Sequence, residues 1–419
     1  MTISHLDVNG RRYAWPTAPV VGLCIDGSQP AYDGAPGYIE EAVAAGVAPF
    51  FGSMMANGTS RLGDCVVPSF TNPNNLSIVT GRPPSVHGIC GNFFYDPESN
   101  TEVMMNDPAL MRAGTLFHAF QTAGAKIAAI TAKDKLRRLL AHGLEFGKDG
   151  AICFSAEHAD QASLDEHGID GLLGLVGLPV PDVYSADLSE FVMAAGVKIM
   201  DRYRPDIMYL STTDYIQHKH APGTPVANQF YAMMDGYLTE LDAAGAVIVV
   251  TADHGMNAKH GADGAPDVLF LQDLLDHDIG AGAARVILPI TDPYVAHHGA
   301  LGSYATIYLG DTIDRDQVMA RLADRPGIAL VLSCEAAAAR FELPADRLGD
   351  IVVIGEQSKV LGTSPDRHDV SGLTEPLRSH GGLTEQKVPV MMNRPTGRPD
   401  GDGLRNFDIF HMALNEAAL

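Results

Sequence analysis

Residues 246–256 read Ala-Val-Ile-Val-Val-Thr-Ala-Asp-His-Gly-Met. The first six form a short apolar run rich in β-branched residues, which is typical of a strand buried on both faces of a parallel sheet. Asp253 and His254 follow directly, so we expect them at the carboxyl end of that strand, where such sheets bind ligands. Zinc accepts both a carboxylate oxygen and an imidazole nitrogen. A strand-end loop with a helix-capping Asp is the alternative interpretation.

The same pattern recurs at two other places in the chain. Residues 20–25 (VVGLCI) and 206–211 (DIMYLS) are apolar runs, and each leads into a polar cluster. Helical patterns lie between the predicted strands, at residues 37–45, 115–123, 189–203 and 228–244. Strands that alternate with helices predict an α/β fold with a doubly wound, mostly parallel sheet.

The sequence pattern changes from about residue 276. Strand-like segments and one helical segment follow at 284–290, 303–309, 314–323 (the helix), 328–333 and 350–354. We therefore predict a smaller, cap-like α+β domain at 276–370, inserted into an α/β core made of 1–275 and 371–419. After a Gly- and Pro-rich loop at 364–382, the core is expected to resume with a strand at 388–392 and a helix from Asn406.

The amino-acid composition excludes some classes of partner and indicates the cellular compartment. The 419 residues carry a net charge of -22, which argues against nucleic acid and anionic membranes as partners. The five cysteines are odd in number and no C-x-x-C pair occurs, which favours a reducing compartment. No signal peptide or apolar run of transmembrane length is recognisable, so the cytoplasm is the expected location. An anion-binding site in such an acidic chain needs local cations.

Three further segments carry candidate metal ligands. Asp214 and His218 are four apart, so they share one face of a helix, although a surface ion pair has the same spacing. Asp26 follows the first predicted strand, where a turn also favours Asp. His380 lies in a Gly-rich loop, Arg-Ser-His-Gly-Gly, and is uninformative alone.

Thr71 is the candidate nucleophile. It precedes a short predicted helix in Pro-Ser-Phe-Thr-Asn-Pro-Asn-Asn, with Pro73 near the first helical position. A helix N-terminus supplies oriented N–H groups and positive potential, which suit a hydroxyl that must ionise and meet a phosphoryl group. The alternative is that Thr71 only caps the helix.

The order Asp, Thr, Asp-x3-His, Asp-His, His resembles the alkaline phosphatase superfamily, in its nucleotide pyrophosphatase/phosphodiesterase-like branch. It looks most like the pattern of the phosphonoacetate hydrolases, and the resemblance runs from Asp26 to the loop after His380. It implies two Zn²⁺ ions per chain and Thr71 as nucleophile. The implied ligands of one ion are Asp214, His218 and His380, and those of the other are Asp26, Asp253, His254 and the Thr71 hydroxyl. Manganese or iron at these positions stays open.

The resemblance also implies substrate contacts from Asn92, Lys133, Lys135 and His218. It implies hydrolysis of the C–P bond of phosphonoacetate, a small-molecule phosphonate, through a phosphothreonine intermediate. A phosphodiesterase or nucleotide pyrophosphatase on the same scaffold is the alternative enzyme, and a zinc-stabilised binding protein is the non-enzymatic one. The two lysines could equally be a solvated charge cluster. The oligomeric state is open, with a homodimer included.

Overall fold

The computed structural model describes residues 4–290, 299–371, 373–399 and 403–417. Its centre is a seven-stranded sheet with the order β4-β19-β10-β3-β9-β7-β8. The three predicted buried strands are adjacent and parallel at its middle: β10 (Val247–Thr251), β3 (Val20–Cys24) and β9 (Ile207–Ser211). Each strand is buried over its whole length, as expected for apolar runs without alternation.

The outer strands complete the sheet. β7 (Ile127–Thr131) and β8 (Ile152–Ser155) extend it in parallel beyond β9, and neither was predicted from the sequence. On the other side β19 (Lys387–Met392), which was predicted as a strand, pairs antiparallel with both β10 and β4 (Thr59–Asp64). The mostly parallel α/β sheet is thus confirmed.

Helices cover both faces of this sheet. Alternate strand residues face opposite ways, so Val21 and Leu23 of β3 join one apolar cluster, and Val20 and Cys24 join the other. The first cluster is closed by α1 (Tyr38–Ala44), α2 (Pro49–Asn57), α9 (Asp187–Tyr203) and α11 (Pro225–Ala243). The second is closed by α3 (Thr71–Thr80), α5 (Leu116–Thr122), α6 (Asp134–Leu140) and α15 (Ile409–Asn415).

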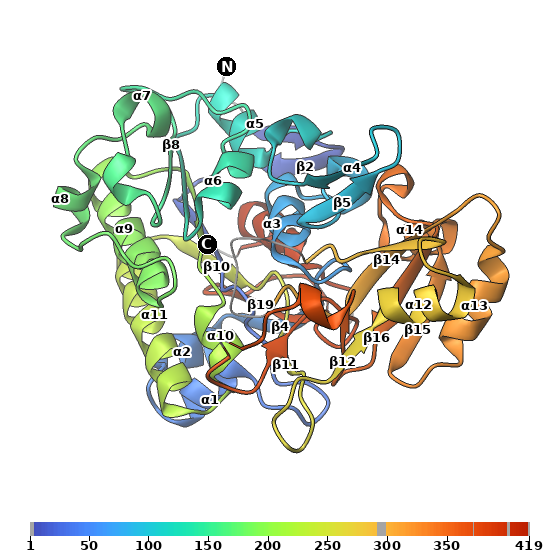
Figure 1. Cartoon of the computed structure of the whole chain (residues 1–419). Helices are drawn as coiled ribbons and strands as arrows, with labels where there is room; N and C mark the ends of the chain where they lie inside the picture. Colours follow the sequence, from blue (N-terminus) through green and yellow to red (C-terminus); the bar gives the residue numbers. More distant parts are fainter. Residues whose placement is uncertain (1–3, 291–298, 372, 400–402, 418–419) are drawn as a thin grey trace.

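A second, antiparallel sheet lies beside the first and is drawn mainly in orange in Figure 1. Its order is β13 (Ala284–Ile287), β14 (Tyr304–Leu309), β16 (Ile351–Gly355) and β15 (Ile328–Ser333). The flanking helices are α12 (Leu271–Ile279), α13 (Arg315–Ala323) and α14 (Cys334–Phe341). Its buried residues share an apolar cluster with α3, so the two sheets pack around a continuous core. The domain boundaries at 276 and 370 stay a prediction.

Short strand pairs connect the two sheets. β11 (Asn257–Ala258) pairs antiparallel with β18 (Arg378–Ser379), and β12 (Val268–Phe270) pairs in parallel with β17 (Val360–Gly362). Among its described residues, the segment 364–382, predicted as a loop, contains the strand β18 and a short 3-10 helix, Pro365–Arg367. None of the helices in the described ranges is both long and apolar enough to cross a membrane. The cytoplasmic location stays a prediction.

Candidate active site

The predicted metal ligands meet at the carboxyl edge of the large sheet. Asp26 follows β3, and Asp214 stands between β9 and α10 (Tyr215–Lys219). Asp253 and His254 follow β10. His380 follows β18, which reaches the same edge because it pairs with β11, three residues beyond His254. All of these side chains are buried.

The ligand atoms form two overlapping groups. Those of Asp26, Asp253 and His254 all lie within 4.8 Å of one another, and so do those of Asp214, His254 and His380. His218 joins the second group, with its Nε2 2.8 Å from Oδ2 of Asp214. The structure therefore brings together all six predicted aspartate and histidine ligands, and it places His254 between the two groups rather than in one of them.

Hydrogen bonds orient the three imidazole rings. Nδ1 of His218 lies 2.7 Å from the carbonyl oxygen of Arg378, Nδ1 of His254 lies 2.8 Å from that of Gly255, and Nδ1 of His380 lies 2.7 Å from that of Ser69. A carbonyl oxygen only accepts, so Nδ1 must carry the ring proton in each case. Nε2 is then the basic nitrogen, as in histidine ligands oriented by an outer hydrogen bond.

Electrostatics and unsatisfied atoms favour a bound cation. Burial, together with the charges of Asp214 and Asp253, raises the pKa of Asp26 well above its ordinary range. Burial, together with the charges of His254 and His218, lowers the pKa of His380 well below its ordinary value. In the described part of the chain, Asp26 Oδ1 and His254 Nε2 lie 3.2 Å apart, and both are buried without a well-formed hydrogen bond. A divalent cation would satisfy these atoms, and the mixed N and O ligands fit zinc.

Thr71 lies at the start of α3 and lines a cavity of about 310 Å³ together with Asp26, Asp214 and His380. The N-cap of α3 is Phe70, whose side chain cannot accept a capping hydrogen bond, and Thr71 is the first helical residue. The hydroxyl is therefore outside the N-cap position. The N-terminus of α3 contributes positive potential beside it.

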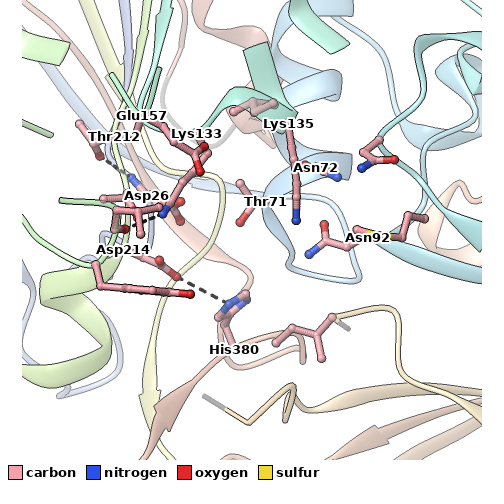
Figure 2. A pocket seen from close by; sticks show the side chains of 18 residues that line it. Asp26, Thr71, Asn72, Asn92, Lys133, Lys135, Glu157, Thr212, Asp214 and His380 are labelled. Atoms are coloured by element: carbon pink, nitrogen blue, oxygen red, sulfur yellow. Dashed lines mark hydrogen bonds and ion pairs between the residues drawn. The ribbon is translucent and has the colours of Figure 1, made fainter. Parts of the chain in front are cut away.

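Lys133 and Lys135 line the same cavity, as does Asn92 (Figure 2). Lys133 is the extended N-cap residue of α6, and Lys135 lies in the first turn of that helix. The chain turns into α6 between the two lysines, and both side chains line the cavity. Lys133 Nζ donates a hydrogen bond of 2.6 Å to the carbonyl of Val183. His218 does not line this cavity, and its substrate contact stays a prediction.

Several residues of the site were missed in the sequence. Asn72, Asn106, Glu157 and Tyr184 line the cavity. Of these, only Asn72 had a local signal, since it directly follows Thr71; the others come from loops without a motif.

Asn75 was missed as well, although it lies only one turn beyond Thr71 in α3. Its Nδ2 donates to the carbonyl of Thr71 at 3.0 Å and to Oδ2 of Asp253 at 3.3 Å. Its Oδ1 accepts from the Tyr209 hydroxyl at 2.7 Å. Asn75 therefore ties the first turn of α3 to a metal ligand and to strand β9.

Comparison with known proteins places this site in a family. Residues 20–383 match the family model described as type I phosphodiesterase / nucleotide pyrophosphatase. The phosphonoacetate hydrolase from Sinorhizobium meliloti 1021, solved in complex with phosphonoacetate, is 58% identical over 100% of both chains, with a TM-score of 0.95. Its complex with phosphonoformate gives the same values. Murine ectonucleotide pyrophosphatase / phosphodiesterase 5 is 18% identical over 96% of each chain, with a TM-score of 0.63, and shares the fold. The chain therefore belongs to the type I phosphodiesterase / nucleotide pyrophosphatase family of hydrolases.

Proposed function

We propose that this protein hydrolyses the C–P bond of phosphonoacetate, giving acetate and phosphate. The observation that carries the proposal is one cavity that holds Thr71, two of the candidate ligand carboxylates, and both lysines. The cavity can thus receive a phosphoryl group and a second anion together. The 58% identity to a phosphonoacetate hydrolase over the full chain supports the same substrate.

Two divalent ions, which we take to be zinc, would be held by the buried ligand groups. One would bind Asp26, Asp253 and His254 beside Thr71, and the other Asp214, His218 and His380. When bound, such ions lower the pKa of a neighbouring hydroxyl and stabilise negative charge on the phosphoryl oxygens and the leaving group.

Thr71 supplies the nucleophile in this proposal. Its Oγ attacks phosphorus and forms a phosphothreonine, while the P–C bond breaks and its electron pair leaves on carbon. The adjacent carboxylate delocalises that pair as an enolate, which takes up one proton to become acetate and so balances the proton that the Thr71 hydroxyl releases. Water then attacks the phosphorus of the phosphothreonine, and phosphate leaves as the Thr71 hydroxyl is restored.

The two lysines explain why an acidic protein would accept a substrate with two anionic groups. With a net charge of -22, the chain as a whole repels phosphonoacetate. We assign Lys133 and Lys135 to the carboxylate and Asn92 to the phosphoryl oxygens. A hydrogen bond to a charged group contributes about 1.5–3 kcal/mol, which is enough to select this substrate over one that lacks the carboxylate.

A phosphodiesterase activity is the second candidate, and one observation favours it. Tyr184 lines the cavity and is 47% exposed, with Lys133 Nζ 5.7 Å from the centroid of its ring, so a nucleotide base could stack on the exposed part of the ring. The single tryptophan, Trp15, does not serve this purpose, because it packs against Phe120 and does not line the cavity.

A substrate comparison tests the proposal. The wild-type protein, loaded with zinc, is assayed with phosphonoacetate and with a nitrophenyl phosphodiester, and kcat/KM is measured for both. We expect phosphonoacetate to be preferred, and the Thr71→Ala variant to be inactive on both substrates, which excludes a contaminating enzyme. A clear preference for the diester would overturn the proposal in favour of the phosphodiesterase.

A further inference from the structure

A buried ion pair outside the reaction cavity joins Lys259 to Glu385. Nζ of Lys259 lies 2.9 Å from Oε1 of Glu385, and both side chains have 0% exposure. Neither residue touches the cavity that holds Thr71. Withdrawing two charges from water is costly, and a buried pair often adds little net stability compared with apolar residues of the same volume. The hydrogen bonds of both residues to neighbouring loops indicate a second role for the pair.

Glu385 connects the loops that follow His254 and His380. Its backbone carbonyl accepts from the N–H of Gly255, directly after His254, at 2.7 Å. Its Oε2 accepts from the N–H of Gly382, two residues after His380, at 2.9 Å. Both loops are thus attached to the same residue, one through its backbone and the other through its carboxylate.

Lys259 makes the matching connections from the other side. Its backbone N–H donates to the carbonyl of Leu377, which directly precedes β18, at 2.8 Å. Its Nζ donates to the carbonyl of Gln357, between β16 and β17, at 2.6 Å. The lysine thereby also ties the smaller sheet to the His380 loop. An apolar side chain of the same size would fill the volume, but it could not make the Nζ contacts.

We infer that Lys259 and Glu385 are positioning residues, which set the relative placement of His254 and His380 and through it the metal affinity of the site. The inference rests on the proposed metal-dependent function. The two loops meet at the stacked rings of His254 and His380, whose centroids are 3.6 Å apart. A change in either loop would shift one Nε2 relative to the other, and ligand placement within a few tenths of an ångström governs metal affinity.

The test uses the full chain and three variants. Glu385→Gln keeps the shape and removes the charge, Lys259→Met keeps most of the stem, and the double variant leaves no unpaired buried charge. The measurements are the Kd for Zn²⁺ by chelator competition, kcat and KM, and the Tm of the metal-free protein. We expect each single variant to bind Zn²⁺ about 10- to 100-fold more weakly, with a lower kcat and little change in KM.

The double variant separates positioning from stability. Without an unpaired buried charge it is expected to recover most of the metal-free Tm, yet to keep the weakened Kd. A matched control is Asp235→Ala, which removes a buried carboxylate that caps α2 through the N–H groups of Phe50 and Phe51. This control should lower Tm and leave Kd unchanged.

One outcome would overturn the positioning role of the pair, and a different outcome would overturn the proposed phosphonoacetate hydrolysis. Variants of the pair that retain the wild-type Kd and kcat, whatever their Tm, would show that the pair has only a structural role. A wild-type protein that binds Zn²⁺ and cleaves only the diester would instead overturn the phosphonoacetate assignment. In that case the comparison of Kd values still decides the role of Lys259 and Glu385.

Discussion

The imidazole rings of His254 and His380 stack face to face, with centroids 3.6 Å apart and planes within 6° of parallel. Two imidazolium ions at this distance would repel each other, and the pKa of His380 is lowered by burial and by His254. The His380 ring is therefore held neutral, which is the form that binds a metal ion. Since each Nδ1 faces a backbone carbonyl, both rings keep Nε2 as the basic nitrogen.

From this arrangement we predict that Asp253→Ala and His218→Ala each remove at least one of two bound metal ions, because each variant loses a ligand from a different group. Elemental analysis of the purified proteins measures the stoichiometry. Asp235→Ala, which removes a buried carboxylate elsewhere, should retain both ions. Full metal content in the double variant Asp253→Ala/His218→Ala would eliminate the proposed metal centre.

Thr71→Ala is expected to abolish turnover, because the variant lacks the attacking oxygen. Its metal content and fold should be largely retained, because the aspartate and histidine ligands are unchanged. Thr71→Ser preserves the hydroxyl and should keep part of the activity. The measurements are kcat, metal content and Tm for both variants. If Thr71 had only a structural role at the start of α3, Thr71→Ala would lower Tm and leave kcat intact.

Lys133→Met and Lys135→Met are expected to lower kcat/KM for phosphonoacetate by about 10- to 100-fold, the equivalent of one charge-assisted contact. The loss should be much smaller for a nitrophenyl phosphodiester, which has no carboxylate. Lys148→Met is the matched control, since Lys148 is exposed and does not line the cavity. Equal losses of kcat/KM on both substrates would mean that the lysines do not bind the carboxylate of phosphonoacetate.

Zinc should stabilise the protein more at pH 8 than at pH 5.5. In the metal-free protein, burial and neighbouring carboxylates raise the pKa of Asp26, and burial raises that of Asp253. A carboxyl with a raised pKa favours the fold while it is protonated, below its unfolded value of about 3.9, and this contribution is lost as pH rises through the folded pKa. A bound ion pairs with the ionised carboxylates and so offsets the stability that the metal-free protein loses when these groups ionise.

The measurement is the difference in Tm between zinc-loaded and chelator-treated protein across that range. Asp253→Asn, which cannot ionise, should show a smaller dependence of that difference on pH. A difference in Tm that is constant with pH in the wild type would contradict the proposed role of these carboxylates.

The sequence by itself determined the centre of the fold and the residues that meet there. The strands within the runs at 20–25, 206–211 and 246–251 are buried on both faces, so each is mostly apolar and can be recognised without knowing its neighbours. Polar residues after such strands must come to one edge when the strands are parallel. This argument alone places Asp26, Asp214 and Asp253 together.

Only the tertiary structure decided how these residues are arranged and what supports them. The strand β7, which delivers Lys133 to the cavity, is short and rich in alanine, and its place between β9 and β8 depends on partners far along the chain. The position of His254 between two ligand groups and the contact of Lys259 with Glu385 depend on loops folding back to the same edge. Contacts of this kind join segments that are distant in the sequence. They produce no local periodicity, so they cannot be predicted from a sequence pattern.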